Sequence, residues 1–89
     1  MPYQIELKPA AIKGLRGLPK SIQKQISSKI DSLANNPLPT KAKKLEGSKN
    51  IYRLRVKDYR ILYQIHKKVL LILVISIGHR KEIYKHLKI

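Results

Sequence analysis

The spacing of apolar residues changes twice along this chain. At the start, the segment YQIEL (3–7) alternates apolar and polar residues, which predicts a strand with Tyr3, Ile5 and Leu7 on one face. In the segment that follows, apolar residues recur every three or four positions instead, which is the period of a helix. A strand followed by helical structure is therefore predicted for the first part of the chain.

Two helices are predicted between residues 9 and 36. The first lies within PAAIKGLRGL (9–18) and is weakened by Gly14 and Gly17, which each cost roughly 1 kcal/mol relative to Ala. The second begins at Pro19 or Ser21 and is stopped by Asn36–Pro37. Its apolar stripe consists of Ile22, Ile26, Ile30 and Leu33. The tight break near Leu18–Pro19 makes the pair an αα-hairpin.

The second half of the chain changes to a period of two. Residues 35–50 are predicted to be a loop, and strand-like runs follow at 51–56, 59–66 and 69–77. The last run does not alternate, which is typical of a central strand covered on both faces, and Gly78 is expected to end it. Ile83 and Leu87 indicate a short terminal helix. This order predicts one α+β domain, 1–89, with the helices on one side of the sheet.

The segment IYRLRVKDYRILYQI (51–65) predicts a β-hairpin with Lys57–Asp58 as its turn. In that register Val56 faces Tyr59, Arg55 faces Arg60, Leu54 faces Ile61 and Tyr52 faces Tyr63. One face is apolar and suits the helices, and the other carries Arg53, Arg55 and Arg60. An isolated run of charges is usually a solvated surface. Here, however, like charges lie opposite each other and guanidinium forks match phosphate oxygens, so we interpret this face as an anion site.

Composition favours a polyanionic partner. The chain has 20 Lys and Arg against 5 Asp and Glu, for a net charge of +15. Nucleic acid is the first candidate, followed by an anionic membrane surface or an acidic protein. The chain has no cysteine, and its histidines are too far apart in sequence to suggest a metal site. With no signal peptide and no membrane-length apolar run, a soluble cytoplasmic protein is expected. The predicted loop adds four lysines, Lys41, Lys43, Lys44 and Lys49.

A second basic segment, SIGHRKEIY (76–84), follows the last predicted strand. It places His79 and Arg80 next to the hairpin if sequential strands are neighbours. His79 could act as a general acid or base because its ordinary pKa is near 6.5, although a lone histidine after a glycine is more often structural. Tyr84 could stack on a base or be an ordinary half-buried tyrosine.

Two blocks of sequence, KKLEGSKNIYRLRVKDYRILYQI and VISIGHRKEIY, resemble the RelE/ParE superfamily of bacterial toxins from toxin–antitoxin modules, and its RelE branch more closely. The resemblance covers nearly the whole chain. It implies a small, mainly antiparallel sheet with an N-terminal αα-hairpin on one face and a short C-terminal helix. RelE-type members cleave messenger RNA in the ribosomal A site, need no metal or cofactor, and are neutralised by an acidic RelB-like antitoxin. Operator DNA would be contacted only through the antitoxin complex, and no membrane is involved.

Carried onto this chain, the resemblance places the active-site residues at Arg53, Arg55, Arg60, Arg80 and Tyr84. Some members have lysines where Arg53 and Arg55 stand. Arginine is a poor proton acceptor at neutral pH, so His79 or Glu46 become the candidate bases. The lysine loop is expected to contact ribosomal RNA.

Two other functions remain open on the sequence alone. A ParE-like inhibitor of DNA gyrase would use the same scaffold and need no catalytic residues, with the arginines as a docking surface. A plain nucleic-acid-binding domain without toxicity would also explain the charge.

Overall fold

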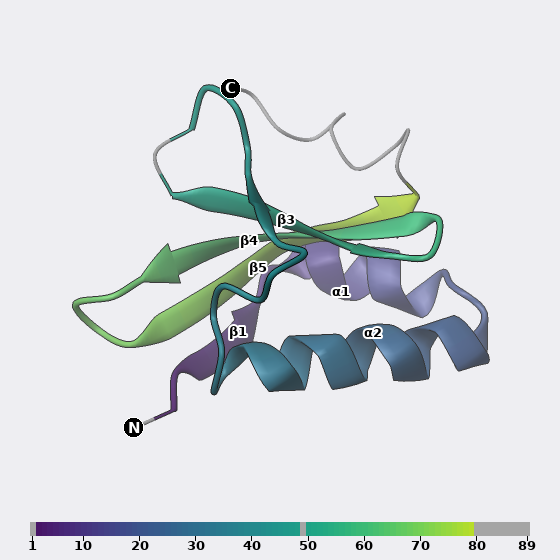
Figure 1. The fold of residues 1–89 in the computed structure, drawn as a ribbon. Helices are drawn as coiled ribbons and strands as arrows, with labels where there is room; N and C mark the ends of the chain where they lie inside the picture. Colours follow the sequence, from purple (N-terminus) through teal and green to yellow (C-terminus); the bar gives the residue numbers. More distant parts are fainter. Residues whose placement is uncertain (1, 49, 80–89) are drawn as a thin grey trace.

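The computed structural model describes residues 2–48 and 50–79, which form two helices packed on one face of a five-stranded sheet (Figure 1). The helices are α1 (Pro9–Arg16) and α2 (Lys20–Leu33). The strands are β1 (Gln4–Leu7), β2 (Lys43–Lys44), β3 (Ile51–Val56), β4 (Tyr59–His66) and β5 (Leu71–His79). The predicted α+β class and the helical hairpin are confirmed. The predicted terminal helix lies outside the described residues.

The sheet is mixed, with the strand order β1-β5-β4-β3-β2. Strands β2 to β5 pair antiparallel with their neighbours, as the short turns between β3, β4 and β5 require. Strand β1 instead runs parallel to β5, with Gln4 opposite Leu71 and Leu7 opposite Val74. A parallel pair needs a long crossover, which here contains both helices and the three strands β2, β3 and β4. The centre of the sheet is therefore β4, with β5 between β4 and β1.

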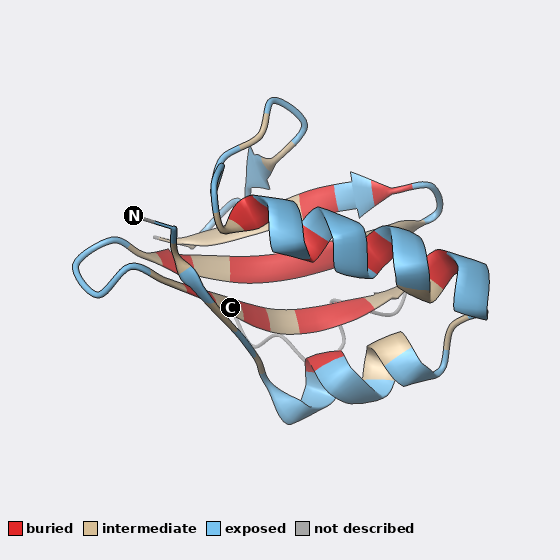
Figure 2. Ribbon diagram, turned by 90° about the horizontal axis from the view of Figure 1, so that it is seen from below, coloured by how far each residue is buried: buried red, intermediate tan, exposed pale blue. Residues whose placement is uncertain are grey.

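The hydrophobic core lies between the helices and the sheet (Figure 2). All four residues of the predicted stripe on α2 are buried, and α2 ends at Leu33, before the predicted stop. On the sheet side, the buried partners come from alternate positions of β3 and β4 and from β5, where the extra residue Ile75 interrupts the alternation. They are Leu54, Val56, Ile61, Tyr63, Ile65, Ile72, Val74 and Ile77. The period of two thus assigns each strand residue to the helix face or to the opposite face.

Helix α1 approaches β5 unusually closely at Gly14. A side chain at this position would collide with the backbone carbonyl oxygen of Ile77. Gly17, by contrast, caps the helix with φ −77° and ψ −3°, a conformation open to any residue, and the nearest atom to its missing Cβ is 3.7 Å away. Gly14 therefore allows a backbone contact that a larger residue would prevent, although both glycines lower helix propensity.

The connection after α2 is attached to the sheet through Tyr63. This side chain is fully buried, and its hydroxyl donates a hydrogen bond to the carbonyl oxygen of Pro37 at 2.7 Å. Burial, together with the neighbouring Tyr52 hydroxyl, raises the pKa of Tyr63 from 10.0 to about 12. The protonated phenol is thus the form that fits the folded protein.

Two parts of the sheet differ from the sequence prediction. Residues 43–44 form the edge strand β2 inside the segment predicted to be loop, because Lys43 pairs with Arg53 and Lys44 with Tyr52. Strand β5 is displaced by two residues and runs through Gly78 instead of ending there. Its burial alternates from Leu71 to Ile75, where the face away from the helices is only half covered, whereas Ser76 and Ile77 are both buried. Leucine-rich composition alone could not reveal this difference.

Candidate functional site

The β3–β4 hairpin forms in the predicted register. Val56 pairs with Tyr59, Arg55 with Arg60, Leu54 with Ile61 and Tyr52 with Tyr63. Leu54 and Ile61 point to the helices and are buried, so strand parity places Arg53, Arg55 and Arg60 on the other face of the sheet. We call Arg53, Arg55, Arg60 and the adjacent Lys43 the arginine face. Lys43 belongs to it because it pairs directly with Arg53.

Arg60 occupies the centre of a row that crosses three strands. Arg55 of β3 lies on one side of it, and Gly78 of β5 lies on the other. Gly78 has no side chain, and a glycine inside a strand often marks a place where a ligand approaches the backbone. The sequence pattern does not reveal this position, because a glycine after an apolar run is typical of a strand end. The row thus combines two guanidinium groups with an adjacent place free of side chain.

The next row of the same face is partly buried. Leu62 pairs with Arg53 on one side and with Ser76 on the other, and these two residues are 0% and 5% exposed. Arg53 and Arg60 are themselves half-buried, whereas Arg55 is exposed. A purely solvated charged face would leave all of its positions open to water. On the arginine face, the cations therefore lie beside positions that are shielded from water.

The electrostatics of the arginine face are unfavourable for the protein alone. Directly opposed residues in a sheet have their Cβ atoms about 5 Å apart, so Arg55 and Arg60 repel each other. Among residues 2–48 and 50–79, the one side-chain hydrogen bond made by its arginines runs from Arg55 Nε to the Lys57 carbonyl oxygen, at 2.9 Å. This bond holds Arg55 toward the turn. An anion bound between the arginines would relieve the repulsion.

The structure separates both candidate bases from this row. His79 pairs with Tyr59, and the two rings meet edge to face with centroids 6.0 Å apart. Tyr59 packs against the helix-side core, so the His79 ring lies on the helix side of the sheet end. Glu46 lies beyond β2, after Leu45, whose N–H bonds the Ile51 carbonyl oxygen at 2.8 Å. Along β3, Ile51 is four residues, or about 13 Å, away from Arg55 and its row.

The other predicted site residues fall at the margins or outside the described part of the chain. Lys41, Lys43 and Lys44 are exposed along the edge of the sheet that β2 forms. Lys49, Arg80 and Tyr84 lie outside residues 2–48 and 50–79. Within those ranges, no cluster of His, Asp or Glu could hold a metal ion, and no helix is long and apolar enough to cross a membrane.

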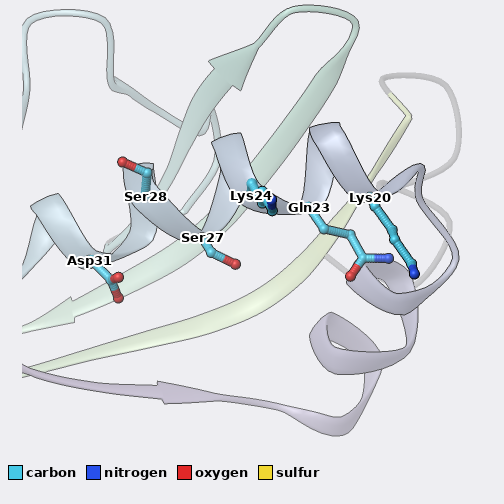
Figure 3. A pocket seen from close by; sticks show the side chains of 6 residues that line it. All are labelled: Lys20, Gln23, Lys24, Ser27, Ser28 and Asp31. Atoms are coloured by element: carbon cyan, nitrogen blue, oxygen red, sulfur yellow. The ribbon is translucent and has the colours of Figure 1, made fainter.

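A hollow on the surface of α2 lies away from the arginine face. It has a volume of about 580 Å³ and follows the outer side of α2 (Figure 3). All six residues that line it are polar and come from this one helix, among them Lys20, Lys24 and the acidic Asp31. A single helix surface with mixed charge provides no converging groups, so this hollow is not a candidate for chemistry.

Comparison with known proteins identifies the family. The profile of the ParE toxin of type II toxin–antitoxin systems, parDE, matches residues 5–84. A protein named toxin RelE3 from Methanocaldococcus jannaschii is 34% identical over 79 residues, covering 84% of this chain and 88% of the relative. The mRNA interferase toxin RelE of Escherichia coli K12 is 28% identical over 88 residues, covering 94% and 92%.

The fold agrees with these sequence matches. The crystal structure of a RelB–RelE antitoxin–toxin complex from Methanococcus jannaschii superposes with a TM-score of 0.73 at 28% identity, covering 92% of this chain and 98% of the matched one. The chain therefore belongs to the RelE/ParE superfamily of toxins from type II toxin–antitoxin modules, and its fold is RelE-like.

Proposed function

We propose that this protein is an endoribonuclease that cleaves messenger RNA on the ribosome and so inhibits translation. The observation that carries the proposal is the row formed by Arg55, Arg60 and Gly78, which provides guanidinium groups beside a position without a side chain. The likeness to the E. coli mRNA interferase toxin supports it.

The reaction proposed is attack by the RNA's own 2′-hydroxyl on the adjacent phosphorus. The 2′-oxygen forms a bond to phosphorus, the bond from phosphorus to the 5′-oxygen breaks, and the products are a 2′,3′-cyclic phosphate and a 5′-hydroxyl. The 2′-proton passes to a base and the leaving 5′-oxygen gains a proton. Charge builds up on the non-bridging phosphate oxygens, where Arg60 and, by family resemblance, Arg80 would stabilise it. Tyr84 would orient a nucleobase of the RNA.

The remaining arginines have supporting roles in this proposal. Arg53, next to the central row on the same face, and Arg55, within that row, would hold the RNA backbone or assist proton transfer. Neither His79 nor Glu46 lies within the row. Which of them can act as the general base therefore depends on where the bound RNA places its 2′-hydroxyl. A general base must come within hydrogen-bonding reach of the 2′-hydroxyl. The lysines of β2 would contact ribosomal RNA through salt-sensitive phosphate contacts.

Loss of one arginine gives the direct test. A cation at ~4 Å interacts by about 4 kcal/mol at an effective dielectric of 20, and if ~3 kcal/mol of that is specific to the transition state, its loss slows cleavage ~10²-fold. Purified Arg60→Ala protein added to translating ribosomes should therefore cut A-site codons about a hundred times more slowly. Arg16→Ala is the matched control, because Arg16 is exposed on α1, far from the arginine face in the fold. Equal rates for the two variants would refute the role of Arg60.

Gyrase inhibition is the second candidate, because the matching family profile is that of ParE. On this alternative the arginine face would dock onto gyrase without cutting RNA. Supercoiling of relaxed plasmid by purified gyrase separates the two functions. Blocked supercoiling together with intact messenger RNA would establish the ParE-like activity and overturn the proposed nuclease.

We further propose an acidic antitoxin as the physiological partner. Relatives of this fold have been solved with RelB bound, and 20 cationic residues against 5 acidic ones favour an acidic protein. The product of a neighbouring gene should co-purify with the toxin at low salt and suppress its cleavage. Failure of any such protein to suppress activity would exclude this partner class.

A further inference from the structure

A basic groove lies on the helix side of the same hairpin, around the edge of β3. It has a volume of about 410 Å³ and is bounded by α2, by the segment around Lys41 and by β3. Four cations line it, Lys29, Lys41, Arg55 and Lys57, and no carboxylate is among its described lining residues. Such a groove concentrates positive potential and attracts an anionic ligand.

The floor of the groove offers little to an apolar ligand. Leu54 and Val56 form part of it, but their side chains are already 3% and 6% exposed in the protein alone. Burial of a ligand against them would remove little further apolar surface from water. Attraction must therefore come from the cations.

The β3 edge at the groove is also too short for strand addition. Strand β2 pairs with Tyr52 and Arg53, which leaves Leu54 to Val56 as the open part of the edge before the turn at Lys57. A partner strand of typical length, about five residues, could not pair along it. A peptide could therefore neither add a strand here nor bury much apolar surface. Both points favour the phosphodiester backbone of a nucleic acid over an acidic peptide.

Arg55 joins the groove to the arginine face. It pairs with Arg60 in the central row, and its hydrogen bond to the Lys57 carbonyl holds it at the sheet edge, where it also lines the groove. We propose that the groove binds the phosphodiester backbone of single-stranded RNA that crosses the arginine face and turns over this edge. This inference rests on the proposed nuclease function and assigns Lys29 and Lys41 as substrate-binding residues.

The binding experiment uses a short 2′-O-methyl single strand, which lacks the attacking hydroxyl and stays intact. Affinity is measured by fluorescence anisotropy from about 50 to about 300 mM salt. The groove variant is Lys29→Gln/Lys41→Gln. Its matched control is Lys20→Gln/Lys24→Gln on the outer surface of α2 (Figure 3), which removes the same charge. All four lysines are exposed, and circular dichroism verifies that both variants fold.

The groove variant should bind about tenfold more weakly than the control, and the slope of log affinity against log salt should fall by about 1.4, which is 0.7 for each of two lost phosphate contacts. Equal losses in both variants would overturn the inference, because only overall charge would then matter. Unchanged RNA affinity with lost affinity for a poly-glutamate peptide would assign the groove to an acidic protein instead.

Cleavage assays keep this test separate from the proposed function. If the wild-type protein cuts A-site codons but the groove variant binds RNA like its control, the groove inference alone fails. If the groove effect is present and no cleavage occurs under any condition, the nuclease proposal fails while the anion-binding assignment stands.

Discussion

At the scale of single residues, strand parity decides which chemistry each side chain can reach. Arg60 and His79 belong to neighbouring strands and are close in the fold, yet Arg60 points away from the helices and the His79 ring packs against Tyr59. The same rule buries Tyr63 beside the half-buried Tyr52. One position along a strand therefore decides whether a side chain points away from the helices or packs against them.

Tyr63 gives a pH-dependent prediction. Its pKa is about 12 in the folded protein against 10.0 as the ordinary value, so between these pH values the unfolded chain loses a proton that the folded chain keeps. The stabilisation is fully present below pH 10 and is lost as pH rises toward 12.

Tyr63→Phe isolates this effect. At about pH 8 the variant should be less stable by about 1 kcal/mol, because the Pro37 carbonyl loses its donor. As pH rises from 10 to 12, the wild-type protein should lose up to about 2.7 kcal/mol that the variant keeps. Urea unfolding of both proteins across this range measures the difference. A difference that stays constant with pH would contradict the account.

At the scale of elements, α1 is positioned by contact with β5 more than by its own helical propensity. The helix has eight residues and begins at Pro9 without a side-chain cap, which is short for stability in isolation. Gln23 of α2 helps to close its end by donating from Nε2 to the Leu18 carbonyl oxygen at 2.8 Å. The close contact at Gly14 then sets the distance between α1 and the sheet.

The two glycines of this region should respond oppositely to substitution. Gly14→Ala forces α1 away from the Ile77 carbonyl and should lower the free energy of unfolding by about 1–3 kcal/mol, as overpacking does. Gly17→Ala meets no clash and should be neutral or stabilising by up to about 1 kcal/mol. Thermal unfolding of both variants provides the comparison. Similar losses in the two would show that α1 does not depend on this contact.

At the scale of the whole molecule, net charge opposes the compact state. A charge of +15 on 89 residues is self-repelling, and the fold brings part of it together on the arginine face. Anions should therefore stabilise the protein in two ways. Simple salt screens the repulsion, and a multivalent anion also binds the arginines that folding assembles.

Tripolyphosphate should therefore raise Tm by several degrees more than sodium chloride of equal ionic strength, since it binds the folded state preferentially. The additional increase should be smaller in Arg60→Gln, because this variant lacks one of the two guanidinium groups of the central row. Scanning calorimetry of both proteins in the two salts makes the measurement. A Tm that follows ionic strength alone in both would show that the arginine face has no preference for clustered phosphate.

The sequence by itself determined the helical hairpin, the register of β3 and β4, and the face on which the arginines stand. These features depend on residues close together in the chain, because a short turn and an apolar period of two leave one arrangement that buries Leu54 and Ile61. Arg80 and Tyr84, to which the family resemblance gives active-site roles, remain predictions.

Only the tertiary structure decided which distant segments meet. The parallel pairing of β1 with β5, the β2 edge strand, the Gly14 contact and the pairing of Gly78 with Arg60 join residues far apart in sequence. The basic groove likewise combines Lys29 of α2 with Lys57 of the hairpin turn. Such contacts depend on how whole elements pack together, and no local pattern of residues encodes that geometry.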